Sequence, residues 1–389
     1  MINRRTWLQA AALGWPAVAW ARRKGRTAMD QGVNTTTYPI YQVGGGSYGE
    51  LGYAIGRQAR ERIGAAFAAR AKWVDELVAY AMADRGPRYD AYLNAVRDEL
   101  PRLEDEMKGI ALGCGIAFER LFAVAINPEL STLMKTATYH QDCTSVAVAG
   151  AGKLWIGHNE DGSCSYRDDM YLLEIAWPGG GKALALSYPG YWPGNGPMVN
   201  SHGIVQTVNY LGAQAVRPGL PRYAIDRAIM EAKDLDEAVA LACHPRRAYS
   251  QHHLLGSCSE RKLVTVETSI ENYSVLPVAG VYPHANHFVH PTMEATPQLT
   301  GYKSSSLPRQ LAAEEWAAAH PDPAALAPDD LLGLLTSHGH APHPVCRHPD
   351  SAASGCTLAG VIITLESKRL RIWDGPPCQA QGRELAWPA

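Results

Sequence analysis

Several patterns that would assign a function at once are missing from this chain of 389 residues. No apolar run reaches the ~18 residues that a membrane-spanning helix needs. The formal net charge of -2 offers no field that would attract nucleic acid or an anionic membrane. We therefore expect no nucleic acid partner and no stable membrane insertion.

Motifs for three kinds of cofactor and metal site are also absent. The eight cysteines contain no Cys-x-x-Cys pair, which argues against a zinc knuckle and a thioredoxin-like site. The glycine-rich stretch 44–50 lacks the Gly-Lys-Ser/Thr of a phosphate-binding loop. No His-Glu-x-x-His zinc motif occurs either, so we expect no cofactor and no metal.

A hydrophobic content of 46% is typical of a globular chain with a substantial core. Residues 1–21 resemble a twin-arginine signal peptide, because Arg4 and Arg5 precede an apolar run that ends in small residues. The alternative is a short N-terminal helix with chance arginines. Export predicts a periplasmic or secreted protein, in which Cys346 and Cys378 are one pair that a disulfide could join.

The segment before residue 143 has mostly helical periodicity. A strand is expected over 37–44 and a long amphipathic helix over about 53–84. A second helical stretch runs from 89 to 113 and is interrupted at Pro101. We therefore expect residues 36–142 to be mainly helical.

After residue 143, short strands with short connections predict antiparallel sheets. The expected strands are 145–150, 153–158, 171–177, 182–187, 203–208, 262–268, 272–277, 357–363 and 369–374. Helices are expected at about 222–244, 307–319 and 328–336. Strands between helices predict a layered α+β architecture without internal repeats.

Cys143 is the first candidate for chemistry. It opens an alternating apolar run, and a second strand-like run, 153–157, follows at hairpin distance. A structural cysteine more often lies within an apolar run, whereas this one stands at the start of a strand beside Thr144 and Ser145. If the bond after Asp142 were cut, the α-amine of Cys143 could act as the base for its own thiol.

The returning strand ends in a polar cluster that includes Asn159 and Asp161. A hairpin brings this cluster back to the beginning of the first strand, so Asp161 could hold the α-ammonium of Cys143. The structural alternative is a turn, because Asn-Glu-Asp-Gly is also a good turn sequence.

Two further asparagines stand at the ends of expected strands. Asn286 could donate its side-chain amide to a tetrahedral oxyanion, and Asn209 is a second candidate donor. For Asn286, capping of a turn is an equally good interpretation of the sequence alone.

Ser304-Ser305-Ser306 and Arg309 open an expected helix. The functional interpretation is a set of serine caps with an arginine that faces substrate. The structural one is simple capping with an exposed arginine. The candidate substrate contacts are Asn159, Asn209, Ser306 and Arg309.

Four histidines and Cys346 lie in the stretch 338–354, which is rich in proline and alanine. Zinc could bind a His-x-His pair with a further histidine, and a metallohydrolase is the corresponding hypothesis. Prolines interrupt the stretch and no metal-binding helix pattern occurs, so a surface loop of histidines is favoured.

Several short segments together carry a resemblance to a known family. They are 49–52, 106–111, 143–145, 158–161, 200–203, 286–288, 345–348 and 373–378. In their order and spacing the chain resembles the acyl-coenzyme A:6-aminopenicillanic acid acyltransferase family, the peptidase C45-like branch of the N-terminal nucleophile hydrolases. The resemblance covers nearly all of the chain from Tyr38 to Cys378.

This resemblance implies a four-layer αββα sandwich and a precursor that cuts itself between Asp142 and Cys143. Residues 22–142 and 143–389 would then be two chains of one domain, an α/β heterodimer or part of a homo-oligomer. Cys143 would be the nucleophile, Asp161 the carboxylate beside its amine, and Asn286 the oxyanion donor. Many relatives carry glycine before the cysteine, whereas this chain has Asp142.

The function that we expect is hydrolysis of a small-molecule or peptide-like amide through a thioester on Cys143. One alternative is an N-acyltransferase of the same family that forms amides. The other is a secreted binding protein that keeps the fold but is never cut.

Overall fold

The computed structural model describes residues 37–135, 143–349 and 355–389. Asn34–Ala389 form one compact unit. The expected signal peptide and Asp142 of the expected cleavage junction lie outside the described residues. Among the residues described, none of the helices combines the length and the apolar character that crossing a membrane requires.

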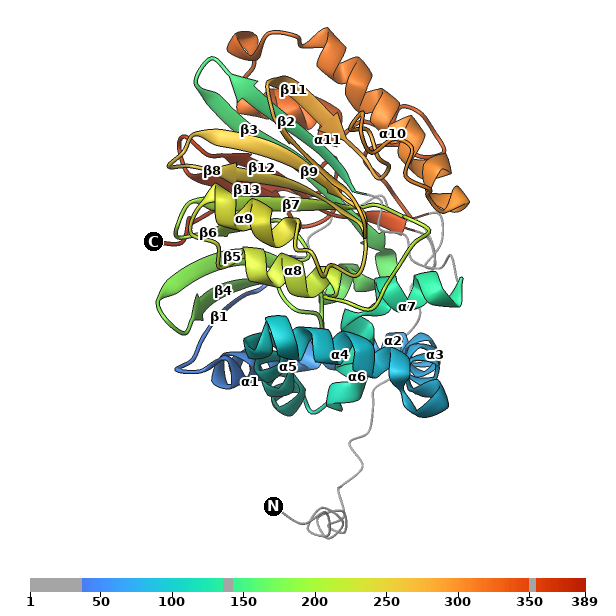
Figure 1. The fold of residues 1–389 in the computed structure, drawn as a ribbon. Helices are drawn as coiled ribbons and strands as arrows, with labels where there is room; N and C mark the ends of the chain where they lie inside the picture. The colour runs from blue at the N-terminus through green and yellow to red at the C-terminus, as the bar shows by residue number, and fades with distance from the viewer. Residues whose placement is uncertain (1–36, 136–142, 350–354) are drawn as a thin grey trace, which may run out of the picture. The chain divides into compact units, whose positions relative to one another are not determined.

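Two sheets form the centre of the fold (Figure 1). Within each sheet, all neighbouring strands are antiparallel except β1 and β4, which are parallel. The first sheet has the order β1 (Ile40–Gly44), β4 (Tyr171–Trp177), β5 (Gly181–Ser187), β6 (Met198–Asn200), β7 (Ile204–Tyr210), β8 (Gln251–Ser257), β9 (Lys262–Thr268) and β10 (Tyr273–Pro277). The second has the order β11 (Gly280–His284), β2 (Thr144–Gly150), β3 (Lys153–Ser163), β12 (Gly355–Thr364), β13 (Arg369–Trp373) and β14 (Gly382–Leu385).

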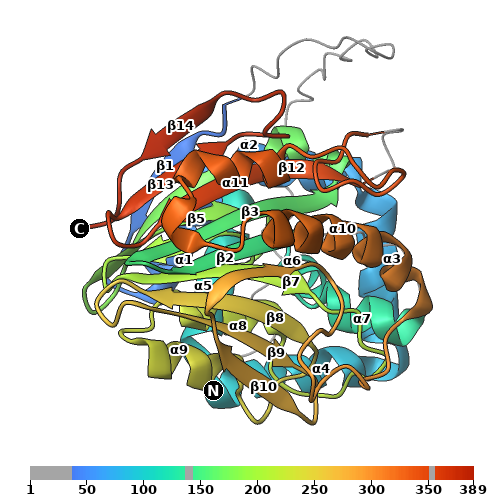
Figure 2. The same cartoon turned by 90° about the horizontal axis from the view of Figure 1, so that it is seen from above.

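Helices cover the outer face of each sheet. On the second sheet, α10 (Thr300–Ala319) packs against β11 and β2, and α11 (Leu331–Leu335) packs against β3 (Figure 2). The other helices lie on the side of the first sheet (Figure 1), and they are α1 (Tyr48–Gln58), α2 (Arg60–Ala69), α3 (Ala71–Met82), α4 (Pro87–Glu99), α5 (Pro101–Cys114), α6 (Phe118–Ala125), α7 (Asn127–Met134), α8 (Arg222–Ile229) and α9 (Leu235–Ala242). Because β2 of one sheet contacts β7 and β9 of the other, the layers are αββα and the expected fold class is confirmed.

The structure corrects several expected boundaries. The helix expected over 53–84 is divided into α1, α2 and α3, because the backbone leaves the helical conformation at Ala59 and Arg70. The helix expected over 222–244 is likewise two helices, α8 and α9. Interruption at Pro101 is confirmed, since α4 ends at Glu99 and Pro101 begins α5.

The cysteines also pair differently from the suggestion made from the sequence. A disulfide joins Cys164 and Cys356, where the end of β3 meets the start of β12. Cys346 and Cys378 remain thiols, with their sulfur atoms 3.4 Å apart.

The start of the described chain is held to both sheets. Strand β1 pairs with β4 in the first sheet. Tyr38 then donates its hydroxyl to the carbonyl of Leu358 on β12, and its backbone N–H to Asp374 beyond β13. Arg383 on β14 donates to the carbonyl of Tyr38. Residues 38–44 are therefore an integral part of the fold.

Helices α1 and α5 touch backbone to backbone through glycines. A Cβ atom at Gly52 would overlap the carbonyl oxygen of Glu106, and one at Gly109 would overlap that of Gly49. Any larger residue at these positions must force the two helices apart. This contact explains the glycines in two of the segments that carry the family resemblance.

The α1–α5 contact makes a prediction about stability. Gly109→Val should lower the free energy of unfolding by about 1–3 kcal/mol or more, because the added carbons meet backbone atoms. Gly64→Ala in α2 is the matched control, since a Cβ there meets nothing within 4 Å. That control should gain about 0.5–1 kcal/mol. Urea unfolding of both variants measures the difference, and equal effects would contradict the close contact.

Candidate active site

Cys143 stands immediately before β2, and its side chain is buried, with 2% of the residue exposed. The expected hairpin is confirmed, because β2 pairs with β3 and Thr144 lies opposite Asn159. This register brings Glu160 and Asp161 beside the cysteine, as the polar cluster at the end of β3 predicted.

The Cys143 thiol lies among acidic and carbonyl oxygens. It donates to Oε1 of Glu160 at 3.7 Å and to the backbone carbonyl of Asp161 at 3.9 Å. Burial, followed by the charges of Glu160 and Asp161, raises the pKa of this thiol well above its ordinary value. In this structure the Cys143 sulfur is therefore protonated at neutral pH, and a protonated thiol is a weak nucleophile.

Arg309 connects the start of β2 to the segment after β11. Its fully buried guanidinium donates to the carbonyl of Cys143 at 2.6 Å and to the Thr144 hydroxyl at 2.9 Å. It also donates to Oδ1 of Asn286 at 2.8 Å. The structure thus brings Cys143, Asn286 and Arg309 together, and Arg309 is buried rather than exposed.

Ser306 and Asn286 are held by a second set of bonds. The Ser306 hydroxyl accepts the backbone N–H of Asn286 at 2.7 Å and lies 2.8 Å from Nδ1 of His287. The Asn286 side chain donates from Nδ2 to the carbonyl of Tyr210 at 2.9 Å. Because α10 begins at Thr300, Ser306 lies within the helix and does not cap it, contrary to expectation.

Asn159 lies on the face of β3 opposite to its neighbours His158 and Glu160. Its Nδ2 atom donates to the carbonyls of Leu335 at 2.9 Å and Val345 at 3.1 Å. Both hydrogens of the amide are used in this way. In this structure Asn159 ties β3 to α11 and to the loop after it, and it does not face the Cys143 thiol as a substrate contact would.

A buried chain of polar side chains runs from Glu160, beside Cys143, into the space between the sheets. Oε2 of Glu160 lies 3.1 Å from Nε2 of His158, whose Nδ1 lies 2.8 Å from the Ser145 hydroxyl. Ser145 donates to Oδ1 of Asn209 at 2.7 Å, and this oxygen lies 3.0 Å from Nδ1 of His252. Asn209 is therefore part of this interior network, and His158 and Ser145 stand between it and Glu160.

Further members of this network are Tyr188, which follows β5, and His284 at the end of β11. Tyr188 donates its hydroxyl to Oε1 of Glu160 at 2.6 Å. The rings of His252 and His284 stack with centroids 3.5 Å apart. Burial, and then the neighbouring His284, lowers the pKa of His252 well below its ordinary value, so this ring is neutral at pH 7.

Sequence reasoning did not assign a role to Glu160, His158, Ser145 or Tyr188. The signal for two of them was present, because alternate residues of a strand share a face and His158 and Glu160 are two positions apart. Tyr188 follows β5 in another sheet, and no local pattern connects it to β3.

Two groups of side chains in the described ranges have donor atoms close enough to hold a metal ion. One is Cys143, His158 and Glu160, which belongs to the site described above. The other is His338, Cys346, His348 and Cys378.

Comparison with known proteins identifies similar sequences. The family model described as acyl-coenzyme A:6-aminopenicillanic acid acyl-transferase matches residues 148–377, which include Asp161, Asn286 and Arg309. A β-alanyl-dopamine/carcinine hydrolase from Drosophila melanogaster is 27% identical over 165 residues. This match covers 39% of the chain and 43% of the relative, so the chain matches less than half of that protein's length.

Solved structures of similar fold show lower sequence identity. A mutant of the conjugated bile acid hydrolase from Clostridium perfringens has a TM-score of 0.41 at 9% identity, over 63% of this chain and 97% of that one. Penicillin V acylase from Agrobacterium tumefaciens has a TM-score of 0.37 at 15% identity, over 60% and 82%. These values are too low to bear on the substrate of this chain.

The acidic surroundings of Cys143 predict a shift in its reactivity. Glu160→Gln removes a negative charge 3.7 Å from the sulfur, which stabilises the thiolate and lowers the pKa of the Cys143 thiol. The rate of alkylation of Cys143 should therefore rise at lower pH in the variant. After proteolytic digestion, mass spectrometry of the peptide that still contains the bond between residues 142 and 143 measures how fast Cys143 is alkylated at each pH.

Glu384→Gln is the control, because Glu384 is exposed on β14 and should leave the pH profile unchanged. A Glu160→Gln profile that stays in place or moves to higher pH would contradict the described electrostatics.

Proposed function

Since the chain belongs to the acyl-coenzyme A:6-aminopenicillanic acid acyltransferase family, we propose that it is a self-processing amide hydrolase with Cys143 as an N-terminal nucleophile. The observation that carries the proposal is the meeting of Cys143, Asn286 and Arg309 through two hydrogen bonds of one buried guanidinium. A sulfur nucleophile, an amide donor and a fixed cation are the groups that acyl transfer requires.

Processing would begin at the peptide bond between Asp142 and Cys143. The Cys143 sulfur attacks the carbonyl carbon of Asp142 and the peptide nitrogen leaves, so a thioester replaces the amide. Water then hydrolyses the thioester, which releases the Asp142 carboxylate and leaves Cys143 with a free α-amine and thiol. Arg309 supports this step, because its bond to the carbonyl of Cys143 fixes the backbone on the other side of the residue.

Turnover would repeat the same chemistry on a substrate amide. The new α-amine accepts the thiol proton, and the thiolate attacks the substrate carbonyl. Nδ2 of Asn286 carries two hydrogens, of which one is donated to Tyr210, and the other would hold the oxyanion. The amine product leaves with the proton, and water resolves the thioester.

Two carboxylates stand beside the expected amine. Asp161, the residue chosen from the sequence, is fully buried and its charge acts on the Cys143 thiol. Glu160 lies nearer the sulfur and is held by Tyr188 and His158. We assign Asp161 to holding the α-ammonium and Glu160 to orienting the thiol.

The proposed substrate is a small amide whose amine part leaves during attack. The similarity to a β-alanyl-dopamine/carcinine hydrolase supports this class and supports water as the acceptor of the acyl group. The acyltransferase name of the family supports the alternative in which an amine takes the place of water. Hydrolysis is favoured if Arg4 and Arg5 direct export, because an exported enzyme has no coenzyme A pool.

Self-processing predicts two fragments from one gene product. Intact-mass spectrometry of the purified protein should show residues 143–389 as a separate species of about 27 kDa, at about 110 Da per residue. Cys143→Ala should remain one chain and lose amide hydrolysis, whereas Cys243→Ser should be cut normally, because Cys243 lies at the end of α9. A Cys143→Ala variant that still hydrolyses the amide would exclude the proposal.

The oxyanion assignment predicts a kinetic effect of Asn286→Ala. The loss of one donor should lower kcat by about 10²–10³ with little change in KM, since the donor acts on the transition state. Asn272→Ala is the control on an exposed asparagine between β9 and β10. The thermal unfolding midpoint of each variant should be measured together with its rates, because the Asn286 side chain also accepts a hydrogen bond from Arg309 and its loss can lower stability. An unchanged kcat would assign the oxyanion to another donor.

A further inference from the structure

Four potential metal ligands converge at one end of the second sheet. They are His338, Cys346, His348 and Cys378, and their donor atoms all lie within 4.8 Å of one another. Nε2 of His338 lies 3.0 Å from Nε2 of His348, which is 3.2 Å from Sγ of Cys378. Sγ of Cys346 lies 3.4 Å from Sγ of Cys378 and 4.0 Å from Nε2 of His348.

The four separations given, 3.0–4.0 Å, lie within a few tenths of an ångström of the edges of a tetrahedral zinc site, so small side-chain adjustments would complete it. Zinc binds sulfur at about 2.3 Å and imidazole nitrogen at about 2.0–2.1 Å, so the donor atoms of a regular tetrahedron are about 3.3–3.8 Å apart. Two sulfur and two nitrogen donors are also a common ligand set of structural zinc. We propose that His338, Cys346, His348 and Cys378 bind one Zn²⁺ ion.

The backbone brings these ligands together from three segments. The N–H of Cys346 donates to the carbonyl of Ser337 at 2.9 Å, which places His338 next to Cys346. Arg347 then exchanges bonds with Thr357 on β12, at 2.9 and 3.1 Å, and this fixes the position of His348. Cys378 arrives from the segment after β13.

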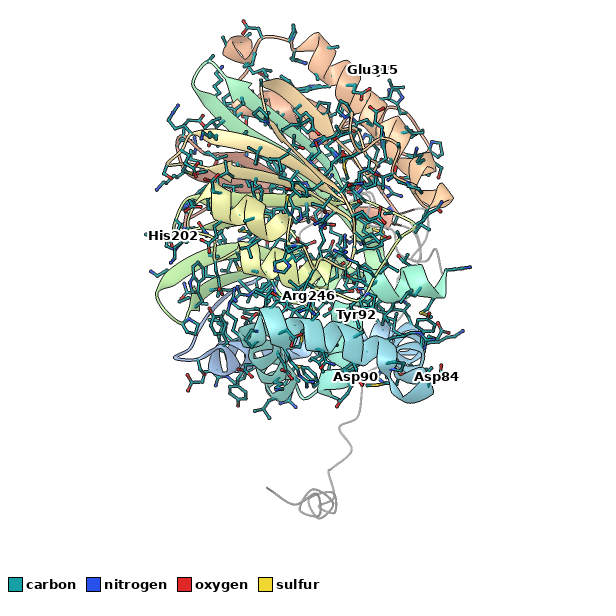
Figure 3. The ribbon with its side chains drawn as sticks, viewed as in Figure 1. Asp84, Asp90, Tyr92, His202, Arg246 and Glu315 are labelled. Carbon is teal, nitrogen blue, oxygen red and sulfur yellow. A yellow bond between two sulfur atoms is a disulfide. The ribbon has the colours of Figure 1, made fainter. Side chains whose placement is uncertain are left out.

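From the sequence alone a surface loop of histidines was favoured, because prolines interrupt the stretch 338–354 and no metal-binding helix pattern occurs there. The fourth ligand, Cys378, lies 30 residues beyond His348 and is adjacent only in the fold. His340, in the same loop, is not part of the cluster, because its Nε2 atom lies 2.7 Å from Glu315 of the outer helix α10 (Figure 3).

The charge and coordination of this set favour a structural ion. Binding releases one proton from each thiol, and two thiolates then neutralise the charge of Zn²⁺ while both imidazoles stay neutral. With four protein ligands the ion has no open position for substrate water, so it would not act as a hydrolase centre. The metallohydrolase hypothesis is therefore a different proposal from this one.

The ion would fix a loop beside the candidate active site. Val345, next to Cys346, accepts from Asn159 of β3, and Thr357 lies opposite Asp161 in the sheet. Zinc would hold residues 345–348 against the end of β3 that carries Glu160 and Asp161. Metal binding can be measured without any substrate, so it stands or fails separately from the proposed hydrolysis.

The first test is the metal content of the full chain. Protein purified without chelator should contain about one zinc per chain by plasma mass spectrometry. Cys378→Ser and His348→Asn should each lower this content at least tenfold while circular dichroism reports a folded protein. His340→Asn and Cys258→Ser are the controls and should keep the zinc. Asparagine suits the left-handed backbone at His340, where φ is 60°.

A second measurement uses wild-type protein alone, so it tests the proposal even if the variants do not fold. Wild-type protein, stripped of metal under reducing conditions, is titrated with Co²⁺. It should develop the d–d and sulfur-to-cobalt absorption bands of a tetrahedral site at one equivalent, and Zn²⁺ should remove them.

Two results would overturn the proposal. One is a folded, reduced wild-type protein that takes up neither ion at one equivalent. The other is a disulfide between Cys346 and Cys378 in the protein as isolated, since the oxidised pair could not supply two thiolates.

Discussion

The buried guanidinium of Arg309 is the interaction on which the rest of the site depends. Transfer of such a charge from water costs several kcal/mol, and only well-placed partners offset it. Here the partners are the Cys143 carbonyl, the Thr144 hydroxyl and the Asn286 side chain. One side chain of α10 thereby joins the beginning of β2 to the segment after β11.

Part of the interior between the sheets is polar, beside an apolar core that both sheets share. Glu160, His158, Ser145, Asn209 and His252 form consecutive contacts there. In a low-dielectric interior such groups are costly unless each finds its partner, so the network favours one register of β2, β3, β7 and β8 over any other. The same bonds that surround Cys143 also help to specify how the two sheets pack.

The parts that the sequence predicted were local, and the parts it missed were not. The β2–β3 hairpin follows from alternation and spacing, and it brought Asp161 to Cys143 as expected. Strand β8 was missed because Gln251-His252-His253 looks like a loop, although all seven of its residues are buried. Arg309 was a candidate, but its burial depends on β2 and β11, which are far from it in the chain. Tyr188 and Cys378 likewise reach their partners only through the fold.

If the proposed cut before Cys143 occurs, the pairing of β1 with β4 and the bond from Tyr38 to β12 have a consequence for the lifetime of the cut molecule. The uncut precursor folds as one polypeptide, so β1 finds β4 at high effective concentration. After the cut, β1 and β4 belong to separate chains, so an unfolded molecule can refold only if the two chains meet in solution. Unfolding of the mature form would therefore be irreversible in dilute solution, and its survival would be governed by how slowly it opens and not by an equilibrium.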